Sequence, residues 1–495
     1  MTTVRFFVLV QAELRLILRE RLTWAILAAL LVALCLAAWT GAGRVASERA
    51  ALAQAAADTD RVVRDARAAH KRYAKPSPIK VNYWQDPTDA FGYMTYFMAA
   101  YAVKPPTPLA AFAAGQSDVQ PAIMRASFGF STVFDDTAYE PGSTARLRLG
   151  PFDLAFVLVY LVPLAVIALA GTRLSSEFDS GILRMIASQP VEPRRVASAK
   201  FGAVALVAIT AVLGGTALAL IVSGGLGALD GWTVTLALLA TALAAYVVLW
   251  VSACALVASL WRGGVVALAI LVLAWSCVTV ALPSTLGLVV DVLAPTPSRI
   301  AAIDASRQAQ VRFYTGEEGA RITAAWLTGK VSKAVSRPGL AEAPEIKRLA
   351  RDAFYDEALA GYRDAARDHA RAVAAWSRRL VILSPATVLA RALEMAAGTD
   401  AERHSAFLAS GAAYRRDLRA FFEPRILAQA LDPVPVCQGC PARLDFTAYD
   451  TVPAFEPSIP RVAAEHQAMV ALGCLMAGAL FITALAYRRL CRWPA

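Results

Sequence analysis

Residues 232–260 read WTVTLALLATALAAYVVLWVSACALVASL, and residues 265–290 read VVALAILVLAWSCVTVALPSTLGLVV. The short segment Trp261-Arg262-Gly263-Gly264 separates the two runs. Neither run contains a charged residue, and each is long enough as a helix to span the roughly 30 Å of hydrocarbon in a bilayer. The pair therefore predicts a hairpin of two transmembrane helices.

Four further apolar runs of similar length occur along the chain. Of the 495 residues, 57% are hydrophobic and 18% are charged, which excludes an ordinary soluble protein and a disordered one. We therefore predict a mainly α polytopic membrane protein with six transmembrane helices. These are expected at residues 22–40, 152–172, 201–222, 232–260, 265–290 and 467–487.

The charges between these runs predict their orientation. Four segments together hold 13 basic and 5 acidic residues: residues 1–21, residues 173–200, the turn at Arg262 and residues 488–495. The short loop 223–231 has neither Lys nor Arg. Because short cytoplasmic loops are rich in Lys and Arg, we expect both termini in the cytoplasm. The net charge of +11 is then mainly an orientation signal and gives no reason to expect nucleic acid as a partner.

Residues 41–151 and 291–466 are then two mostly helical extracytoplasmic insertions. In the first, residues 44–75 predict a polar continuation of the first membrane helix. The aromatic-rich residues 81–103 suit a domain core or the lipid headgroup layer, and contact with a substrate is the alternative. In the second insertion, a helix is expected after Ala401 that ends before Pro424.

Two cysteines lie outside the membrane runs and the C-terminal tail, as Cys437-Gln438-Gly439-Cys440. A local disulfide is the default interpretation in an oxidising compartment, and a metal site or a redox pair is the alternative. Cys437 and Cys440 are therefore weak metal candidates, with His404 and His466 as further ligands if the fold brings them close.

Catalytic motifs are missing from the sequence. Gly329-Lys330 is followed by Val331, so no phosphate-binding loop is formed there, and no zinc-protease or serine-hydrolase motif occurs. The predicted spans carry almost no charge, and Asp153 is expected to be hydrated at an outer edge. The chain is therefore expected to be no enzyme, to hold no cofactor or metal, and to need an outside energy source for any transport.

Two amphipathic stretches occur on the cytoplasmic side. In residues 1–21, the apolar positions predict a helix on the lipid surface: Phe6, Val10, Leu14, Ile17 and Leu18. In residues 173–200, the apolar positions Phe178, Ile182, Met185 and Ile186 predict a short helix that ends at Pro190. The apolar face of this second helix suits a partner's groove or the lipid headgroups.

The stretch Glu177, Ser180-Gly181-Ile182-Leu183 and Ser188-Gln189-Pro190-Val191 resembles the coupling-helix signature of ABC-2-type transporter permeases, with Ile182 in place of the usual Thr. The order of amphipathic helix, six spans and coupling helix is also similar. Further stretches resemble the bacterial subgroup that carries the uncharacterised extracytoplasmic domain family 3526. They are Pro295-Thr296-Pro297-Ser298-Arg299, Leu383-Ser384-Pro385-Ala386, Ala397-Gly398-Thr399, Arg403-His404 with Phe407, and Leu418-Arg419 with Phe421-Phe422 and Pro424.

This resemblance implies the permease subunit of a bacterial inner-membrane ABC transporter. It implies a second permease, identical or homologous, and two ATPase subunits that carry ATP and Mg. It further implies export by alternating access, and it leaves room for a periplasmic partner of the insertions. The residues expected to contact the ATPase are Glu177, Phe178, Gly181, Ile182, Leu183, Met185, Ile186, Gln189 and Pro190. The sequence indicates no particular substrate.

Two other functions compete with this interpretation. A membrane-anchored sensor or assembly factor would use the insertions to bind a periplasmic partner and the helices to relay the signal. A membrane-embedded thiol oxidoreductase would use Cys437 and Cys440.

Overall fold

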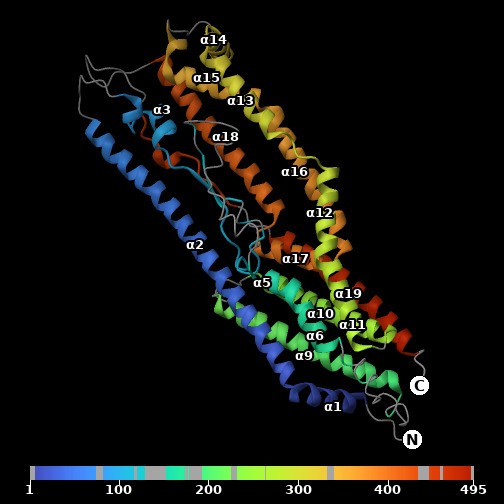
Figure 1. Cartoon of the computed structure of the whole chain (residues 1–495). Helices are drawn as coiled ribbons and strands as arrows, with labels where there is room; N and C mark the ends of the chain where they lie inside the picture. Colours follow the sequence, from blue (N-terminus) through green and yellow to red (C-terminus); the bar gives the residue numbers. More distant parts are fainter. Residues whose placement is uncertain are drawn as a thin grey trace.

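The computed structural model describes residues 6–73, 82–115, 117, 120–126, 128, 152–171, 173, 177, 185, 192–223, 231–261, 263–331, 339–432, 445–457 and 461–491. Figure 1 shows an elongated molecule with a bundle of helices at one end and a second group of helices at the other. The helices of the bundle are apolar, whereas those of the second group are more polar. Helix α1 (Phe6–Arg19) and the end of α19 (Arg461–Cys491) lie at the same end of the molecule. We call that end the base.

All six predicted spans fall in apolar helices of the bundle. Among the described residues, five helical segments are long and apolar enough to cross a membrane, and the segment at Leu154–Ala170 is a shorter apolar helix. The bundle consists of α2 (Arg21–Tyr73), α5 (Leu154–Phe156), η4 (Val157–Leu161), α6 (Val162–Ala170), α9 (Pro193–Val222), α10 (Thr233–Leu260), α11 (Gly264–Ser276), η6 (Cys277–Ala281), α12 (Leu282–Leu293) and α19. The prediction of a mainly α polytopic protein is confirmed.

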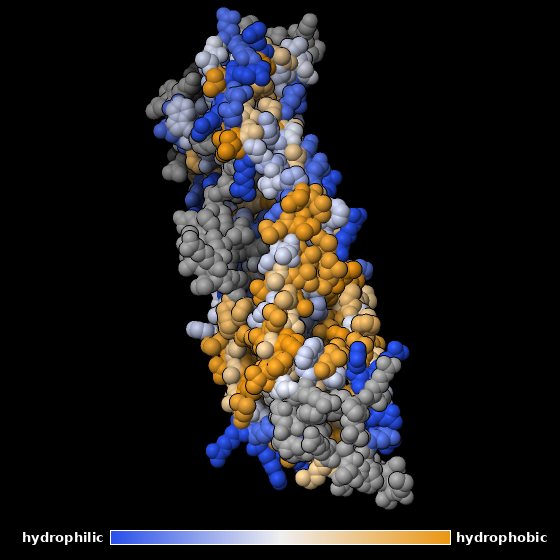
Figure 2. Space-filling model, turned by 45° about the vertical axis from the view of Figure 1, so that its right-hand side comes forward, coloured by the Kyte–Doolittle hydropathy of each residue, from blue (hydrophilic) through white to orange (hydrophobic). Residues whose placement is uncertain are grey.

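The surface of the bundle is apolar. On the face seen in Figure 2, hydrophobic side chains gather in the lower half of the molecule, between hydrophilic surfaces at its two ends. Leu273, Leu288, Val292, Leu480 and Phe481 are each more than 60% exposed. Water would penalise this much exposed apolar surface, whereas lipid would not.

Two of the bundle helices widen by one residue just before a proline. In η4, which precedes Pro163, and in η6, which precedes Pro283, the closing N–H bonds to the carbonyl five residues earlier. Proline lacks an N–H and clashes with the carbonyl four residues before it. The local π-turn accommodates each proline without ending the helix.

Helix α2 joins the bundle to the far end of the molecule. It runs unbroken for 53 residues, or about 80 Å. Its first part is apolar and its second part is polar, as the sequence predicts for residues 44–75. One continuous helix therefore connects the base with the polar end (Figure 1).

The polar end, which we call the head domain, combines residues 44–128 and 299–457. It contains one two-stranded antiparallel sheet, in which Tyr101 lies opposite Arg125. Its elements are η1 (Tyr83–Gln85), α3 (Ala90–Gly92), η2 (Tyr93–Phe97), β1 (Tyr101–Val103), β2 (Ile123–Arg125), α13 (Arg299–Tyr314), α14 (Glu318–Lys330), η8 (Leu340–Glu342), α15 (Pro344–Ala358), α16 (Ala360–Leu380), η9 (Val381–Leu383), α17 (Pro385–Ala397), α18 (Ala401–Leu431) and η10 (Tyr449–Thr451).

The core of the head domain draws on both predicted insertions. Phe91 and Tyr93 from the first are buried against Phe422, Phe446 and Tyr449 from the second. The Tyr93 ring centroid lies 5.4 Å from that of Phe446 and 5.0 Å from that of Tyr449. Phe91 and Tyr93 therefore help to build a domain core, whereas Trp84 and Tyr96 of the same stretch are exposed. The two insertions fold together.

Helix α18 is longer than the sequence predicts. The expected end before Pro424 is wrong, because the helix continues to Leu431. Phe422, Ile426 and Ala430 lie on one face of α18 and are buried. Their burial outweighs the one hydrogen bond that proline cannot make.

Helix α17 attaches the head domain to the bundle. Its buried apolar face, which includes Leu389 and Leu393, belongs to the bundle core. Ser384 caps the helix and donates its hydroxyl to the carbonyl of Val278 at 2.8 Å. Gly398 ends the helix in the left-handed region at φ 67°, which glycine adopts without strain.

Candidate functional site

Helix α1 packs under the bundle at the base. Ile17 is 1% exposed, and Val10 and Leu14 pack against the bundle core. Phe7 is 83% exposed. Three members of the predicted apolar stripe thus face protein, so α1 is attached to the bundle and does not merely lie on lipid.

A buried ammonium group joins α1, the loop 173–200 and α9. Lys200 Nζ lies 2.7 Å from Oε1 of Glu177 and 3.1 Å from Oε2 of Glu13. The Lys200 side chain is 5% exposed. One cation therefore holds carboxylates from two separate segments against the first turns of α9.

A second ion pair attaches the start of the same loop. Arg173 donates from Nη1 to Oε1 of Glu20 at 3.1 Å and from Nη2 to Oε2 at 2.6 Å. Glu20 lies between α1 and α2, and it also accepts a hydrogen bond from Thr23 at 3.2 Å. We call Glu13, Glu20, Arg173, Glu177 and Lys200 the base cluster.

The base cluster can transmit force. Bidentate guanidinium–carboxylate pairs fix orientation as well as distance. Removing one partner of a largely desolvated pair costs several kcal/mol, so a displaced loop would move α1 and α9 with it. Among the described residues of the base cluster, each carboxylate is paired with a cation, and this arrangement suits a mechanical role.

Two of the nine predicted partner-contacting residues lie in the described part of the chain. Glu177 belongs to the base cluster, and Met185 has a 67% exposed side chain. The other seven lie outside the described residues: Phe178, Gly181, Ile182, Leu183, Ile186, Gln189 and Pro190. Their contacts with a partner stay a prediction.

The candidate cysteine site is also untested, because Cys437 and Cys440 lie outside the described residues. Within the described ranges, no group of three or more His, Cys, Asp or Glu residues could hold a metal ion. His404 is on α18 beside Lys104, with 3.5 Å between Nδ1 and Nζ, whereas His466 is exposed on α19. Burial, and then Lys104, lower the pKa of His404 to about 4.

Asp153 does not have the hydrated position that the sequence suggests. It is 6% exposed. Its carboxylate accepts the N–H of Phe156 at 2.8 Å and that of Ala114 at 2.7 Å. The hydration expectation is wrong because Asp153 caps α5 and binds the head domain to the bundle.

The sequence motif singles out Glu177 but not its partner. Lys200 follows Glu177 by 23 positions and Glu13 by 187 positions. From the sequence, both basic residues, Arg173 and Lys200, count only as orientation charges. Their position at the two ends of the loop is the one signal that could have indicated a structural role.

Comparisons with known families agree with these features. A family model described as ABC-2 family transporter protein matches residues 121–277, which include the loop and Lys200. A second, the domain of unknown function DUF3526, matches residues 343–432, which hold α15–α18. No curated protein and no solved structure gave a match. The chain is therefore a multi-pass membrane protein that carries an ABC-2 family transporter domain and DUF3526, as the permease subgroup that its sequence resembles does.

Proposed function

We propose that this permease is the membrane subunit of an exporter in a bacterial inner membrane, driven by two ATPase subunits that dock on residues 173–200. The ATP and Mg belong to those subunits. A second permease, identical or homologous, completes the translocation path. In this proposal the base cluster and both termini face the cytoplasm.

The observation that carries the proposal is the contact of Lys200 with Glu177 and Glu13 at 2.7 and 3.1 Å. A partner that pushes on the loop would displace Glu177. Because Lys200 on α9 contacts both Glu177 and Glu13, and Glu13 lies on α1, a displacement of Glu177 would move α9 and α1 as well. This is how a peripheral ATPase would switch the bundle between inward-open and outward-open states.

The docking surface itself is apolar. Met185 is exposed, and the predicted helical spacing puts Ile182 on the same face. An apolar helix face of this kind fits a groove on a partner. The remaining predicted residues, from Phe178 to Pro190, would complete the contact.

The head domain would stand on the opposite side of the membrane. Its attachment through α2 and α17 places it over one end of the bundle (Figure 1). There it would border the exit of the path or receive a periplasmic partner. Export is the direction that suits such a placement.

The test replaces the docking surface and leaves the fold unchanged. In the variant Ile182→Asp/Met185→Asp, two carboxylates would enter an apolar contact, at a cost of several kcal/mol. We expect loss of the co-purifying ATPase and of stimulated ATP hydrolysis in reconstituted vesicles. Insertion into the membrane should be normal.

The matched control makes the same two changes on the head domain. Ile303 and Val311 lie on α13 and are 40% and 61% exposed. Ile303→Asp/Val311→Asp should bind and stimulate the ATPase normally. Normal coupling in the Ile182→Asp/Met185→Asp variant would reject the docking assignment.

A sensor or assembly factor is the second candidate, and the unbroken α2 favours it. A helix of 53 residues that joins the base to the head domain would also suit signal relay without transport. Vesicles that hydrolyse ATP with the partner ATPase but move no candidate lipid, glycolipid or peptide would favour this function. Measured movement of one of them would exclude it.

A further inference from the structure

The head domain contains a pocket between α16, α18 and the β1–β2 sheet. Its volume is about 430 Å³. The strands come from the first predicted insertion and the helices from the second. Ala102, Gly411 and Ala412 form part of the lining and leave room because their side chains are small. The pocket therefore exists only when the two insertions fold together.

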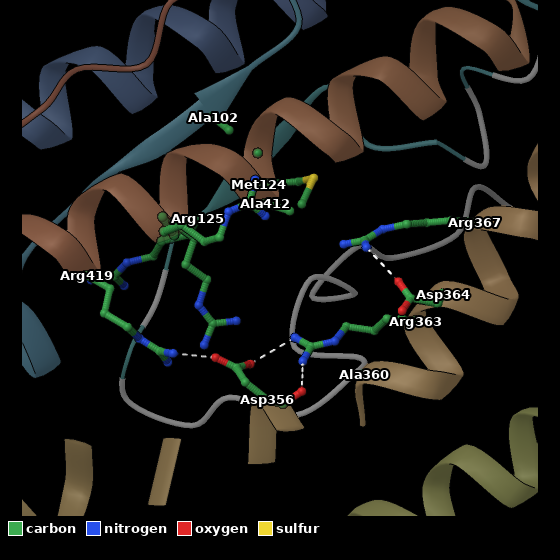
Figure 3. A pocket seen from close by; sticks show the side chains of 14 residues that line it. Ala102, Met124, Arg125, Asp356, Ala360, Arg363, Asp364, Arg367, Ala412 and Arg419 are labelled. Atoms are coloured by element: carbon green, nitrogen blue, oxygen red, sulfur yellow. Dashed lines mark hydrogen bonds and ion pairs between the residues drawn. The ribbon is translucent and has the colours of Figure 1, made fainter. Parts of the chain in front are cut away.

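The lining of the pocket is strongly basic. Among the described residues, two carboxylates line it, from Asp356 and Asp364, together with six guanidinium groups. The arginines are Arg125, Arg363, Arg367, Arg415, Arg416 and Arg419. Figure 3 shows the guanidinium groups of Arg125, Arg363 and Arg419 gathered around Asp356.

Asp356 holds two of these arginines in place. Its Oδ1 lies 2.8 Å from Nη1 of Arg363, and its Oδ2 pairs with Arg419. Burial alone would raise the pKa of Asp356, but Arg419 and Arg363 outweigh burial and hold that pKa below its usual range. Asp356 therefore stays ionised, and its single charge is shared by two cations.

Among the described lining residues, the positively charged side chains outnumber the negatively charged ones. Asp356 is shared by Arg363 and Arg419, and Asp364 pairs with Arg367 at 2.9 Å. Within the described part of the chain, the buried Nη2 of Arg419 has no hydrogen-bond partner. A buried donor without a partner is unusual in a folded protein, and a bound anion would supply the acceptor that this donor lacks. Gathering like charges costs free energy that a bound anion would recover.

We propose that this pocket binds a phosphate-bearing ligand. Guanidinium groups form paired hydrogen bonds to phosphate oxygens, and the excess of arginines suits a ligand with more than one negative charge. The volume is larger than inorganic phosphate needs, so the ligand carries a further group. Nothing in this inference depends on transport or on the ATPase.

The distance of the pocket from the transmembrane bundle limits where its ligand can come from. Arg415 lies about 20 Å along α18 from Ala401, and α17, which precedes α18, packs on the bundle. The pocket is thus well above the bundle. A ligand reaches it either from water, as a soluble phosphate compound, or as the headgroup of a lipid that has left the bilayer.

The test measures binding to the purified full chain by calorimetry at constant ionic strength. Inorganic pyrophosphate is the soluble probe, and dihexanoyl phosphatidic acid below its micelle concentration is the lipid probe. Sulfate is the control anion. We expect one of the two phosphate probes to bind with a Kd below about 1 mM and more tightly than sulfate. Which probe binds identifies the source.

Two matched double variants locate the binding. Arg367→Gln/Arg416→Gln removes two charges from the pocket, on α16 and α18. The control variant, Arg371→Gln/Arg425→Gln, removes two charges from the same helices but outside the pocket. It is matched because Arg371 pairs with Asp368 at 3.1 Å, just as Arg367 pairs with Asp364 at 2.9 Å. The pocket variant should bind about tenfold more weakly than the unmutated chain, whereas the control variant should bind normally.

Two results would overturn the proposal. One is that neither phosphate probe binds better than sulfate. The other is that both double variants lose affinity equally, since the effect would then be one of overall charge. Circular dichroism checks that both variants are folded, and restored affinity in Arg367→Lys/Arg416→Lys would show that charge at these positions is what binds.

Discussion

The base cluster and the arginine-lined pocket of the head domain, which we call the arginine pocket, have opposite arrangements of charge. At the base, one ammonium group lies between two carboxylates, and the Lys200 side chain is 5% exposed. In the head domain, one carboxylate lies between two guanidinium groups, and the Asp356 side chain is 32% exposed. The first arrangement is closed, whereas the second borders a cavity with further arginines.

This difference indicates two kinds of use. A closed cluster with matched partners fixes segments to one another, which suits transmission of movement. An open cluster with surplus charge is incomplete without a ligand. The base should therefore respond to substitution, and the head domain should respond to pH and to anions.

The largest effect is expected from Lys200→Met. It removes the buried ammonium group that lies between Glu13 and Glu177, which should lower the free energy of unfolding by about 3 kcal/mol. Thermal unfolding in detergent measures the loss. Arg195→Met on the same helix is the control, because the pair of Arg195 with Glu192 is exposed and its loss should cost less than about 0.5 kcal/mol. Equal effects would mean that the base cluster is not closed.

The second prediction concerns pH and the junction of head domain and bundle. Burial, followed by Asp400 and Asp153, raises the pKa of Glu394 to about 7. Since the folded state holds this proton more tightly than the unfolded state, stability is lost as the pH rises from about 4.5 to about 7. Glu394→Gln removes that loss, so its stability relative to the unmutated chain should rise by at most about 3 kcal/mol across this range.

The Glu394→Gln variant must be compared with the unmutated protein because the effect of His404 on stability changes with pH in the opposite direction. Its pKa is lowered to about 4, so it destabilises the fold as the pH falls from about 6.5 toward 4. Taking the difference in melting temperature between Glu394→Gln and the unmutated chain cancels the His404 contribution. A difference that is constant from pH 4.5 to pH 7.5 would contradict the assignment.

A smaller effect is expected from Asp356→Asn. Arg363 and Arg419 lose their shared counter-charge, but both reach solvent, so the loss should be about 1 kcal/mol. Added pyrophosphate should restore the melting temperature, since the anion replaces the carboxylate. Asp368→Asn, which affects an exposed pair, should show neither the loss nor the recovery. If pyrophosphate did not raise the melting temperature of Asp356→Asn, Asp356 would not be part of the phosphate-binding site.

The smallest effect concerns the wall of the pocket at Gly411. A Cβ there would lie 3.7 Å from Ala102 Cβ and from Met124 Cε, which is ordinary contact. Gly411→Ala should therefore stabilise α18 by about 0.5 kcal/mol, as Gly329→Ala should stabilise α14, where the space is open. A net loss of stability at Gly411, measured by thermal unfolding, would show that the pocket is tighter than the distances indicate.

The sequence predicts the bundle well because its signal is local. Each run of apolar residues, such as 232–260, carries the length and hydrophobicity of a span within itself. The polar extension of α2 is equally local. The π-turns before Pro163 and Pro283 are harder to predict, since proline alone does not distinguish a widened turn from a kink.

The head domain could not be predicted in the same way. Its core joins Tyr93 to Phe446, and its surface joins Arg67 to Asp450, 383 positions away. Such contacts leave no mark in a single sequence. The arginines of α16 and α18 also look like an ordinary solvated helix surface until the β1–β2 sheet is placed beside them.

The base cluster lies between these extremes. Glu177 is found through a local motif, whereas its contact with Lys200 depends on how the loop folds back on α9. The exposed Met185 agrees with the predicted docking face, but the residues around it, including Ile182, are outside the described part of the chain.

The most direct test of the account is photo-crosslinking in intact membranes that contain the partner ATPase. A benzophenone amino acid in place of Met185 should crosslink to the ATPase, because this side chain would lie in the groove of the ATPase. The same group in place of Val311, which is 61% exposed on α13, should give no such product. Crosslinking to the ATPase from Val311 and none from Met185 would contradict both the docking site and the orientation of the chain.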